Sequence, residues 1–527
     1  MNQSSATSVI ENIFEYLGRR FPVACTSDEF TYFPQVQLTE PEWNIWDYFS
    51  SDAINETVQR LSVWEDELGL LGSTRLDLQL QIDLRLLKRV IQSLREQLAE
   101  VRSWELQPTL YLTIACTGLA QAVESEDPAA IHERAKTLPA FLDQARHNLT
   151  KVPVLFRDIG LEMVSDTRNY LVTLLESLPE LKSVLEALDS FENELRRVPT
   201  YAHFLLQRDL LERVLRFHLH CDIDIQDIVN ALDQEIGDVQ SILVKEARGL
   251  LSEESTTSYS QRIWLDAFRN VPVPLVSKRE LVRLYEEEIC RLAENCAAQG
   301  FVSPDLVSSC PVSVLAMPEF FSAIRVGASY SIPPKYPPSG GKFYIAVRHS
   351  TDESRRASLR EYRMTCAHET YPGHHLLDCS RWSLKRPLRR NIEYPTFYEG
   401  WACFAEELMR LTGYFAKPED RLLLARRRFV RAIRGKVDIG LQMGALDFTT
   451  AVKYLEKTGI GTERAKLLAR KYPLNPGYQL CYTIGLRRFL NMWHQYSNGG
   501  LTKFVRAIFN QGEILFTDLE EILRSHE

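Results

Sequence analysis

The sequence lacks the features that mark membrane-spanning and nucleic-acid-binding proteins. No run of about eighteen apolar residues occurs in the 527-residue chain, so we expect no membrane-spanning helix. The net charge is −8 and no long block of like charge occurs, which argues against nucleic-acid and membrane partners. Residues 1–6 are polar, without the basic and apolar stretches of a signal peptide or a nearby lipobox-like cysteine.

Paired cysteines are also missing. The ten cysteines are scattered without any Cys-x-x-Cys pair; Cys25, Cys116 and Cys221 are far apart, and only Cys290 and Cys296 share one helical pattern. In a chain of this size, this pattern favours reduced, mostly buried thiols and a cytoplasmic protein. We do not expect a zinc–thiolate site.

No fixed repeat period occurs, so the chain is not predicted to be a solenoid. Instead, apolar residues recur at three- and four-residue spacing through the first half, the pattern of amphipathic helices. We therefore predict a helical scaffold lobe over residues 1–251. The clearest helical patterns cover residues 57–98, 131–149, 164–188, 191–219 and 225–250, with prolines 108, 128, 153, 179 and 199 near their ends. His218 and His220 fall on different helix faces and are predicted to be structural.

The composition changes after residue 251. A Ser/Thr-rich connector, residues 252–260, precedes a predicted catalytic lobe over residues 252–527. Within it, residues 312–347 are irregular and strand-like, and residues 343–347 (FYIAV) are the best strand candidate. The predicted fold is therefore mainly α, with a small β-sheet before the histidine cluster. By analogy, an edge strand there can align an extended substrate.

Three of the eleven histidines lie in the segment HETYPGHH, residues 368–375. Zinc prefers imidazole and carboxylate ligands and keeps one position open when the site is catalytic. In the HExxH motif two histidines lie one helical turn apart, and the adjacent glutamate acts as general base. Here Glu369 matches that base, but Pro372 occupies the second histidine position. Pro372 and Gly373 are expected to bulge the helix and return a later histidine to the His368 face.

The spacing does not decide which histidine returns. His375 is seven residues after His368 and shares its face in a regular helix, although two turns separate them. His374 follows Gly373 and requires a bulge that absorbs two residues. We favour His374 as the second ligand and assign His375 to a neighbouring or substrate-facing role.

The segment EGWA, residues 399–402, supplies a third candidate ligand. Glu399 stands near a predicted helix start, where a carboxylate can also simply stabilise the helix dipole. Paired with the histidine cluster, Glu399 is predicted to bind the metal. Glu406 falls on the same helix face and is predicted to orient a ligand imidazole.

These motifs together resemble one family. HETYPGHH followed by YEGWACFAEEL is similar to the domain of unknown function 885 family, which belongs with the helical zinc metallopeptidases. The segments at 328–334 (ASYSIPP), 437–444 (VDIGLQMG) and 475–485 (NPGYQLCYTIG) extend the resemblance over the C-terminal half. It implies a helical metallopeptidase-like fold around one zinc ion.

The chain departs from the family at two positions. Gln442 stands where the family has a histidine, and Thr483 stands where it has a lysine. Tyr482 matches a family tyrosine, and we predict that Tyr482 or His375 stabilises an oxyanion, although a buried core role for Tyr482 is an equal alternative. Arg348, Arg363 and Arg434 can bind a substrate carboxylate or be surface charges.

The predicted function is zinc-dependent hydrolysis of peptide or peptide-like amide bonds, with Glu369 activating water. His368, His374 and Glu399 are the predicted ligands, and small peptides the predicted substrates. Two alternatives remain: a metal-binding protein whose catalysis is altered at Gln442 and Thr483, and a tailoring hydrolase of a non-peptide amide or ester. A di-iron oxidase is disfavoured because paired Glu-x-x-His motifs are absent.

Overall fold

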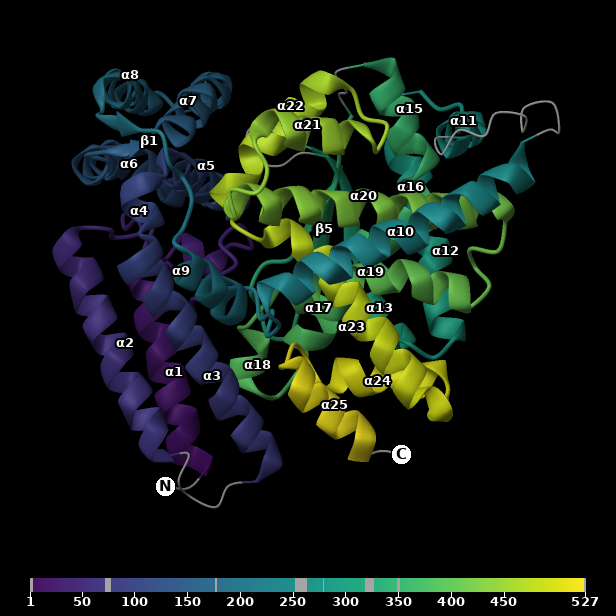
Figure 1. Ribbon diagram of the computed structural model, residues 1–527. Helices are drawn as coiled ribbons and strands as arrows, with labels where there is room; N and C mark the ends of the chain where they lie inside the picture. The colour runs from purple at the N-terminus through teal and green to yellow at the C-terminus, as the bar shows by residue number, and fades with distance from the viewer. Residues whose placement is uncertain are drawn as a thin grey trace.

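Helices form most of this computed structural model (Figure 1), which describes residues 3–71, 77–175, 178–251, 263–277, 279–317, 327–347 and 351–525. The mainly α prediction is confirmed. The connector at 252–260 and Arg348 lie outside the described residues. The helices of the first half are α1 (Gln3–Arg20), α2 (Ser51–Leu71), α3 (Leu78–Glu96), α4 (Ser103–Leu106), α5 (Pro108–Glu124), α6 (Pro128–Asn148), α7 (Val154–Leu174), α8 (Leu181–Arg197), α9 (Arg208–Arg213) and α10 (Ile225–Leu250).

Proline and aspartate set several of these helix starts. Pro108 and Pro128 occupy the first position of α5 and α6, where a missing backbone N–H is harmless. Asp127 and Asp224 cap α6 and α10 by accepting backbone N–H groups through their side chains. The apolar pattern over residues 191–219 is interrupted at Pro199, as that proline predicts: α8 ends at Arg197, and the short strand β2 (Thr200–Tyr201) pairs with β1 (Val152–Pro153).

The second half holds the remaining helices and a three-stranded sheet. In this sheet β5 (Gly341–Ile345) lies between β3 (Val312–Ala316), parallel to it, and β4 (Ser329–Ser331), antiparallel to it. The predicted strand at 343–347 is thus present but begins and ends two residues earlier. The helices are α11 (Ile263–Asn270), α12 (Leu281–Ala298), α13 (Pro304–Ser309), α15 (Asp352–Arg360), α16 (Tyr362–Glu369), α17 (His374–Trp382), α18 (Pro387–Arg390), α19 (Pro395–Leu411), α20 (Pro418–Gln442), α21 (Phe448–Glu456), α22 (Thr462–Lys471), α23 (Cys481–Tyr496), α24 (Leu501–Gln511) and α25 (Phe516–Ser525).

The arrangement in space only partly follows chain order. In Figure 1, helices α1 to α8 occupy one side, while α10 lies along α20 among the helices of the second half. One hydrophobic core cluster runs from Ile10 to Leu523 and so includes residues of both halves. The division into lobes at residue 251 stays a prediction. Among the described residues, no helix combines the length and apolarity that crossing a bilayer requires.

Candidate metal centre

The histidine segment forms two helices joined by a sharp break. Helix α16 ends at Glu369 and α17 begins at His374, with Thr370 to Gly373 in non-helical conformations between them. The predicted distortion at Pro372 and Gly373 is present, but it is a complete break between two helices rather than a bulge. Pro372 lacks the N–H that a continuing helix needs, so the chain turns completely instead of loosening.

Close backbone packing folds α17 back onto the end of α16. A Cβ atom on Gly373 would lie 1.8 Å from the carbonyl oxygen of His368, so only glycine fits there. Trp401 Nε1 donates a hydrogen bond of 2.9 Å to the carbonyl of Pro372, which holds the turn against α19. The fold-back places the imidazole rings of His368 and His374 4.8 Å apart between centroids.

Glu399, from α19, completes a group of three. Its Oε2 lies 3.5 Å from Nε2 of His368 and 3.5 Å from Nε2 of His374. The three side chains are buried, and their ligand atoms all lie within 4.8 Å of one another. Tetrahedral ligands about 2.1 Å from a zinc ion are about 3.4 Å apart, so this spacing suits a metal. Oε2 is also buried without a hydrogen-bond partner among the described residues, as an open ligand atom would be.

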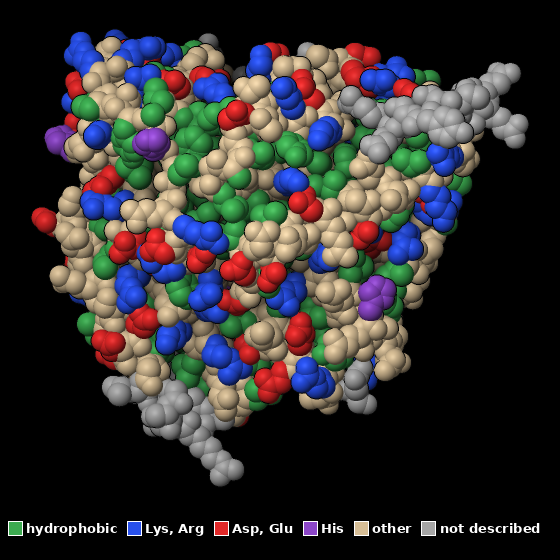
Figure 2. All heavy atoms as spheres, viewed as in Figure 1, with side chains coloured by type: hydrophobic (Ala, Val, Ile, Leu, Met, Phe, Trp, Pro, Cys, Tyr) green, Lys and Arg blue, Asp and Glu red, His purple; other side chains and the backbone are tan. Residues whose placement is uncertain are grey.

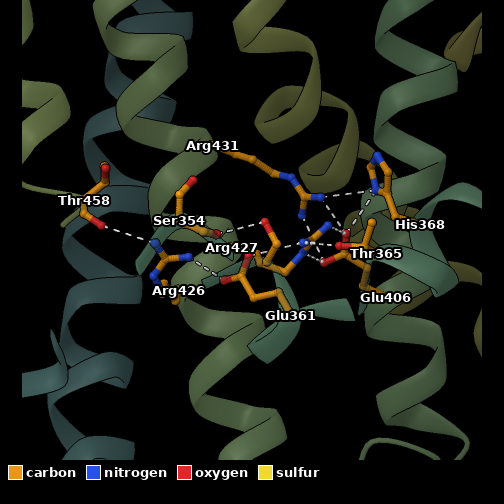
Figure 3. Close-up of polar contacts among 10 residues, drawn as sticks. Ser354, Glu361, Thr365, His368, Glu406, Arg426, Arg427, Arg431 and Thr458 are labelled. Carbon is orange, nitrogen blue, oxygen red and sulfur yellow. Dashed lines mark hydrogen bonds and ion pairs between the residues drawn. The ribbon is translucent and has the colours of Figure 1, made fainter. Parts of the chain in front are cut away.

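Glu406, from the same helix, binds the other nitrogen of His368. His368 Nδ1 lies 3.0 Å from Glu406 Oε1, and Arg427 and Arg431 of α20 both donate to that carboxylate. Figure 3 shows these four side chains converging. Although burial alone raises the pKa of Glu406, the two guanidinium groups and His368 hold it well below its usual range. Glu406 thus stays charged and fixes the His368 ring with Nε2 facing Glu399, as a metal ligand requires.

Glu369 lies next to the three candidate ligands, and its carboxylate has no hydrogen-bond or ion-pair partner among the described residues. It is close enough to His368, His374 and Glu399 to feel their charges. Burial and the neighbouring Glu399 raise its pKa, against the effect of the two histidines. An unpaired carboxylate next to candidate ligands is placed to accept a proton from water.

His375 does not join this group, as the choice of His374 over His375 predicted, and its two ring nitrogens have other partners than a substrate oxyanion. Its Nδ1 lies 2.9 Å from the hydroxyl of Tyr330 in β4, and its Nε2 lies 3.0 Å from the carbonyl of Cys310. The reason is its place in α17: one residue after His374, it projects from a different face of the helix.

A disulfide bond between Cys310 and Cys379 lies beside His375. The expectation that all ten thiols are reduced is therefore wrong for these two. The other eight cysteines are free, and all of them except Cys290 are buried.

Two tyrosines approach the candidate centre from the segment before α23 and from α23 itself. Tyr478 was not predicted from the sequence; its hydroxyl donates a 2.7 Å hydrogen bond to Oε1 of Glu399. Tyr482 stacks its ring on His368, with 6.4 Å between centroids. Gly400 and Gly485 bring α19 and α23 together, since a Cβ on Gly400 would lie 2.4 Å from Cα of Gly485. The sequence did offer one signal for Tyr478: it stands four residues, about one helical turn, before Tyr482.

The two departures from the family are buried polar groups. Both side-chain atoms of Gln442 and the hydroxyl of Thr483 have no hydrogen-bond partner among the described residues. Neither residue belongs to the group of three candidate ligands.

A cavity of about 1120 Å³ opens next to Tyr478. Its walls come from both halves of the chain, including α5 and α7 on one side and α22 on the other. Figure 2 shows hydrophobic side chains gathered between the two halves on this face. The candidate ligands do not line this cavity, but Tyr478 does, and its hydroxyl bonds Glu399.

A family model for bacterial proteins of unknown function, DUF885, matches residues 40–521. The chain belongs to this family. The resemblance stated from its motifs is thereby confirmed, and it extends into the N-terminal half, where the sequence motifs gave no signal. No curated protein matches the chain.

Solved structures share the fold over nearly the whole length. A "putative lipoprotein of unknown function" from Shewanella oneidensis has a TM-score of 0.76 at 15% identity, covering 98% of this chain and 99% of its own. A "putative lipoprotein" from Colwellia psychrerythraea has a TM-score of 0.74 at 14% identity, with 99% and 98% covered. Metallocarboxypeptidase 1 of Trypanosoma cruzi reaches a TM-score of 0.43 at 12% identity, with 99% and 98% covered, too low to carry an argument.

These relatives overturn the cytoplasmic expectation. The two structures with high TM-scores are of putative lipoproteins, so the cytoplasmic prediction is withdrawn. The Cys310–Cys379 disulfide agrees with that correction, because disulfides persist in oxidising compartments.

Proposed function

We propose that the chain is a zinc-dependent hydrolase of peptide or peptide-like amide bonds. The observation that supports it most is the group of two imidazoles and one carboxylate, with ligand atoms within 4.8 Å, beside the unpaired carboxylate of Glu369. Two histidines, one acidic ligand and an adjacent glutamate are the elements of zinc hydrolase sites.

His368, His374 and Glu399 would hold the ion. Bound there, zinc would supply Lewis-acid polarisation of a water molecule and of the scissile carbonyl. Glu369 accepts the water proton and passes it to the leaving nitrogen, and its raised pKa suits a group that both takes and gives a proton. Tyr482, stacked on His368, is placed to donate a hydrogen bond to the developing oxyanion.

The proposed substrates are short peptides. The cavity of about 1120 Å³ that leads to Tyr478 is enclosed by helices from both halves and suits a ligand of a few residues rather than a folded protein.

One alternative has its own support. Gln442 and Thr483 replace ionisable family residues and are buried without partners among the described residues. A metal-binding protein without hydrolase activity would be compatible with that change, and the test below separates the two.

The test combines metal content with peptide hydrolysis. We expect elemental analysis to find about one zinc ion per chain and a mixed peptide library to be cleaved only without chelator. Glu369→Gln should retain zinc and lose about 10²- to 10⁴-fold in rate. Asp352→Asn, at an exposed carboxylate on α15, is the matched control and should change neither. Zinc binding without cleavage of any peptide would favour the non-catalytic alternative, and a wild-type rate in Glu369→Gln would refute the mechanism.

A further inference from the structure

We propose that Arg434 and Arg464 form a subsite that binds a free carboxylate of the substrate, next to the candidate metal centre. This inference rests on the proposed function and narrows its substrate class to short peptides cleaved near a free C-terminus. Arg434 belongs to α20 and Arg464 to α22.

Arg434 differs from the other arginines of its helix. On α20, five arginines form ion pairs with glutamates of other elements: Arg421 with Glu246, Arg426 with Glu361, Arg427 and Arg431 with Glu406, and Arg428 with Glu235. Arg434 has no such ion pair among the described residues. Its Nη2 donates to the side chain of Gln479, and its Nε is buried without a partner.

The acidic group nearest in sequence, Asp438, feels the charge of Arg434 but forms no ion pair with it among the described residues. Asp438, one turn further along α20, accepts the backbone N–H groups of Gly477 at 3.2 Å and Gln479 at 2.9 Å. A buried cation without a paired anion is unfavourable. The guanidinium of Arg434 therefore has capacity for a carboxylate that the chain itself does not supply.

Arg464 adds a second unpaired guanidinium, and unlike Arg434 it lines the cavity. It lines the cavity with Leu467 and Lys471, at the i, i+3 and i+7 positions of one face of α22. No ion pair or hydrogen bond of Arg464 occurs among the described residues. Burial lowers the pKa of Arg464, and repulsion by the charge of Arg434 lowers it further. A bound carboxylate would relieve that repulsion, and arginine is the side chain best shaped to bind one.

The ring of Tyr482 lies between the subsite and the candidate ligand His368. The guanidinium of Arg434 is 5.2 Å from the ring centroid of Tyr482, whose other contacts include the stacked ring of His368. Tyr478, between the cavity and Glu399, contacts Tyr482 edge to face. Because an extended residue spans about 3.5 Å, a carboxylate held here belongs to the first or second residue after the scissile bond.

The experiment compares each peptide as free acid and as C-terminal amide. Zinc-loaded protein is given tri- and tetrapeptides in both forms, and kcat/KM is measured for each. We expect the acids to be preferred by at least about tenfold, as for a charged hydrogen-bonded pair. Arg464→Ala and Arg434→Gln should remove this preference by raising KM for the acids, while the amides are unaffected. Lys466→Ala is the control, because Lys466 is exposed on the same helix and pairs with Glu463.

A binding measurement separates this inference from the proposed function. Calorimetry with zinc-loaded Glu369→Gln compares affinities for the same acids and amides without turnover. If no peptide is cleaved, the proposed hydrolysis fails, and the calorimetric preference alone decides the subsite. Equal binding of acids and amides, or a preference that survives in Arg464→Ala, overturns it. If Arg434→Gln does not fold, Arg434→Lys replaces it. Amides with an internal Asp or Glu that bind as well as the acids would support the subsite and assign its carboxylate to a side chain.

Discussion

His374 and His375 are neighbours in the chain with opposite surroundings. His374 faces the carboxylate of Glu399 and the ring of His368, while its own ring stacks on Tyr398 at 3.9 Å between centroids. His375 faces a tyrosine hydroxyl, a backbone carbonyl and a disulfide, with no carboxylate in contact. One residue along α17 thus separates a candidate metal ligand from a structural imidazole.

The difference shows that partners, rather than residue type, decide what a buried histidine does. Burial lowers the pKa of His375 to about 4, against the opposing effect of its hydrogen bond to the Cys310 carbonyl. With Nε2 donating to that carbonyl and Nδ1 accepting from Tyr330, both nitrogens of the neutral ring are used. His374 keeps Nε2 directed at Glu399 and has no such pair of partners.

Replacing each histidine in turn is the strongest way to break this comparison. His374→Ala should lose a ligand and bind zinc at least about 10³-fold more weakly, since losing a ligand should exceed the 10- to 100-fold effect of an outer partner. His375→Ala should bind zinc as the wild type does and unfold more easily, because Tyr330 loses its partner. Competition with a chromophoric chelator measures the affinity.

His368→Ala is the matched control and should behave as His374→Ala does. Equal zinc affinity of His374→Ala and the wild type, with a loss in His375→Ala instead, would reverse the assignment.

The disulfide beside His375 gives a second test of the contrast between the structural surroundings of His375 and the candidate metal site at His374. Cys310 and Cys379 are 69 residues apart, and closing a loop of that length stabilises a fold by about 4 kcal/mol. Replacing both by serine should lower the free energy of unfolding by about that amount and leave zinc affinity unchanged. Denaturant unfolding and chelator competition test both expectations.

Cys290→Ser, at the exposed free cysteine, should alter neither quantity. Ten titratable thiols in the denatured, unreduced protein would show that the bond does not form.

The sequence predicted the chemistry of the candidate centre better than its geometry. Residue types and motif order were enough to choose His368, Glu369 and Glu399, because few alternatives provide imidazole and carboxylate groups so close together. The complete break at Pro372 was not predictable from spacing, since it depends on the contact of Gly373 with the His368 carbonyl and on Trp401. These are tertiary contacts.

Other features had no local signal. The disulfide joins Cys310, directly after α13, to Cys379 in α17, which only tertiary packing brings together, so scattered cysteines looked reduced. Tyr478 reaches Glu399 from a segment 79 residues away. The break at Pro199 was predictable from the proline, but the short strand β2 after it was not, because its partner β1 lies far away in the sequence.

His218, which is half-buried, extends the comparison to another histidine without a carboxylate partner. It bonds Thr31 and Gln97 at 2.9 and 2.8 Å, and burial lowers its pKa to about 4. A folded-state pKa below the unfolded value of about 6.5 favours the neutral ring. The stability it contributes is therefore present above about pH 6.5 and is lost as the pH falls toward 4.

For His218→Gln, which cannot titrate, we expect the acid-induced loss of unfolding free energy between about pH 7 and pH 4.5 to be smaller by about 2 kcal/mol. Urea unfolding at both pH values measures it. His132→Gln, at an exposed histidine paired with Glu180, should match the wild type. An unchanged pH dependence in His218→Gln would mean that His218 is protonated in the fold.

The smallest expected change in zinc affinity comes from replacing Glu406, the carboxylate that pairs with His368. Glu406 pairs with Nδ1 of His368 and is held by Arg427 and Arg431, whereas His375 has no carboxylate partner. Glu406→Gln keeps the shape but removes the charge, so zinc affinity should fall by about 10- to 100-fold, the usual effect of losing such an outer partner. Chelator competition measures this, with Glu407→Gln as the control, since Glu407 of the same helix pairs with Arg410 instead. If both variants bound zinc as tightly as the wild type, a carboxylate partner would not be what distinguishes a ligand histidine here, and the contrast between His368 and His375 would rest on ring orientation alone.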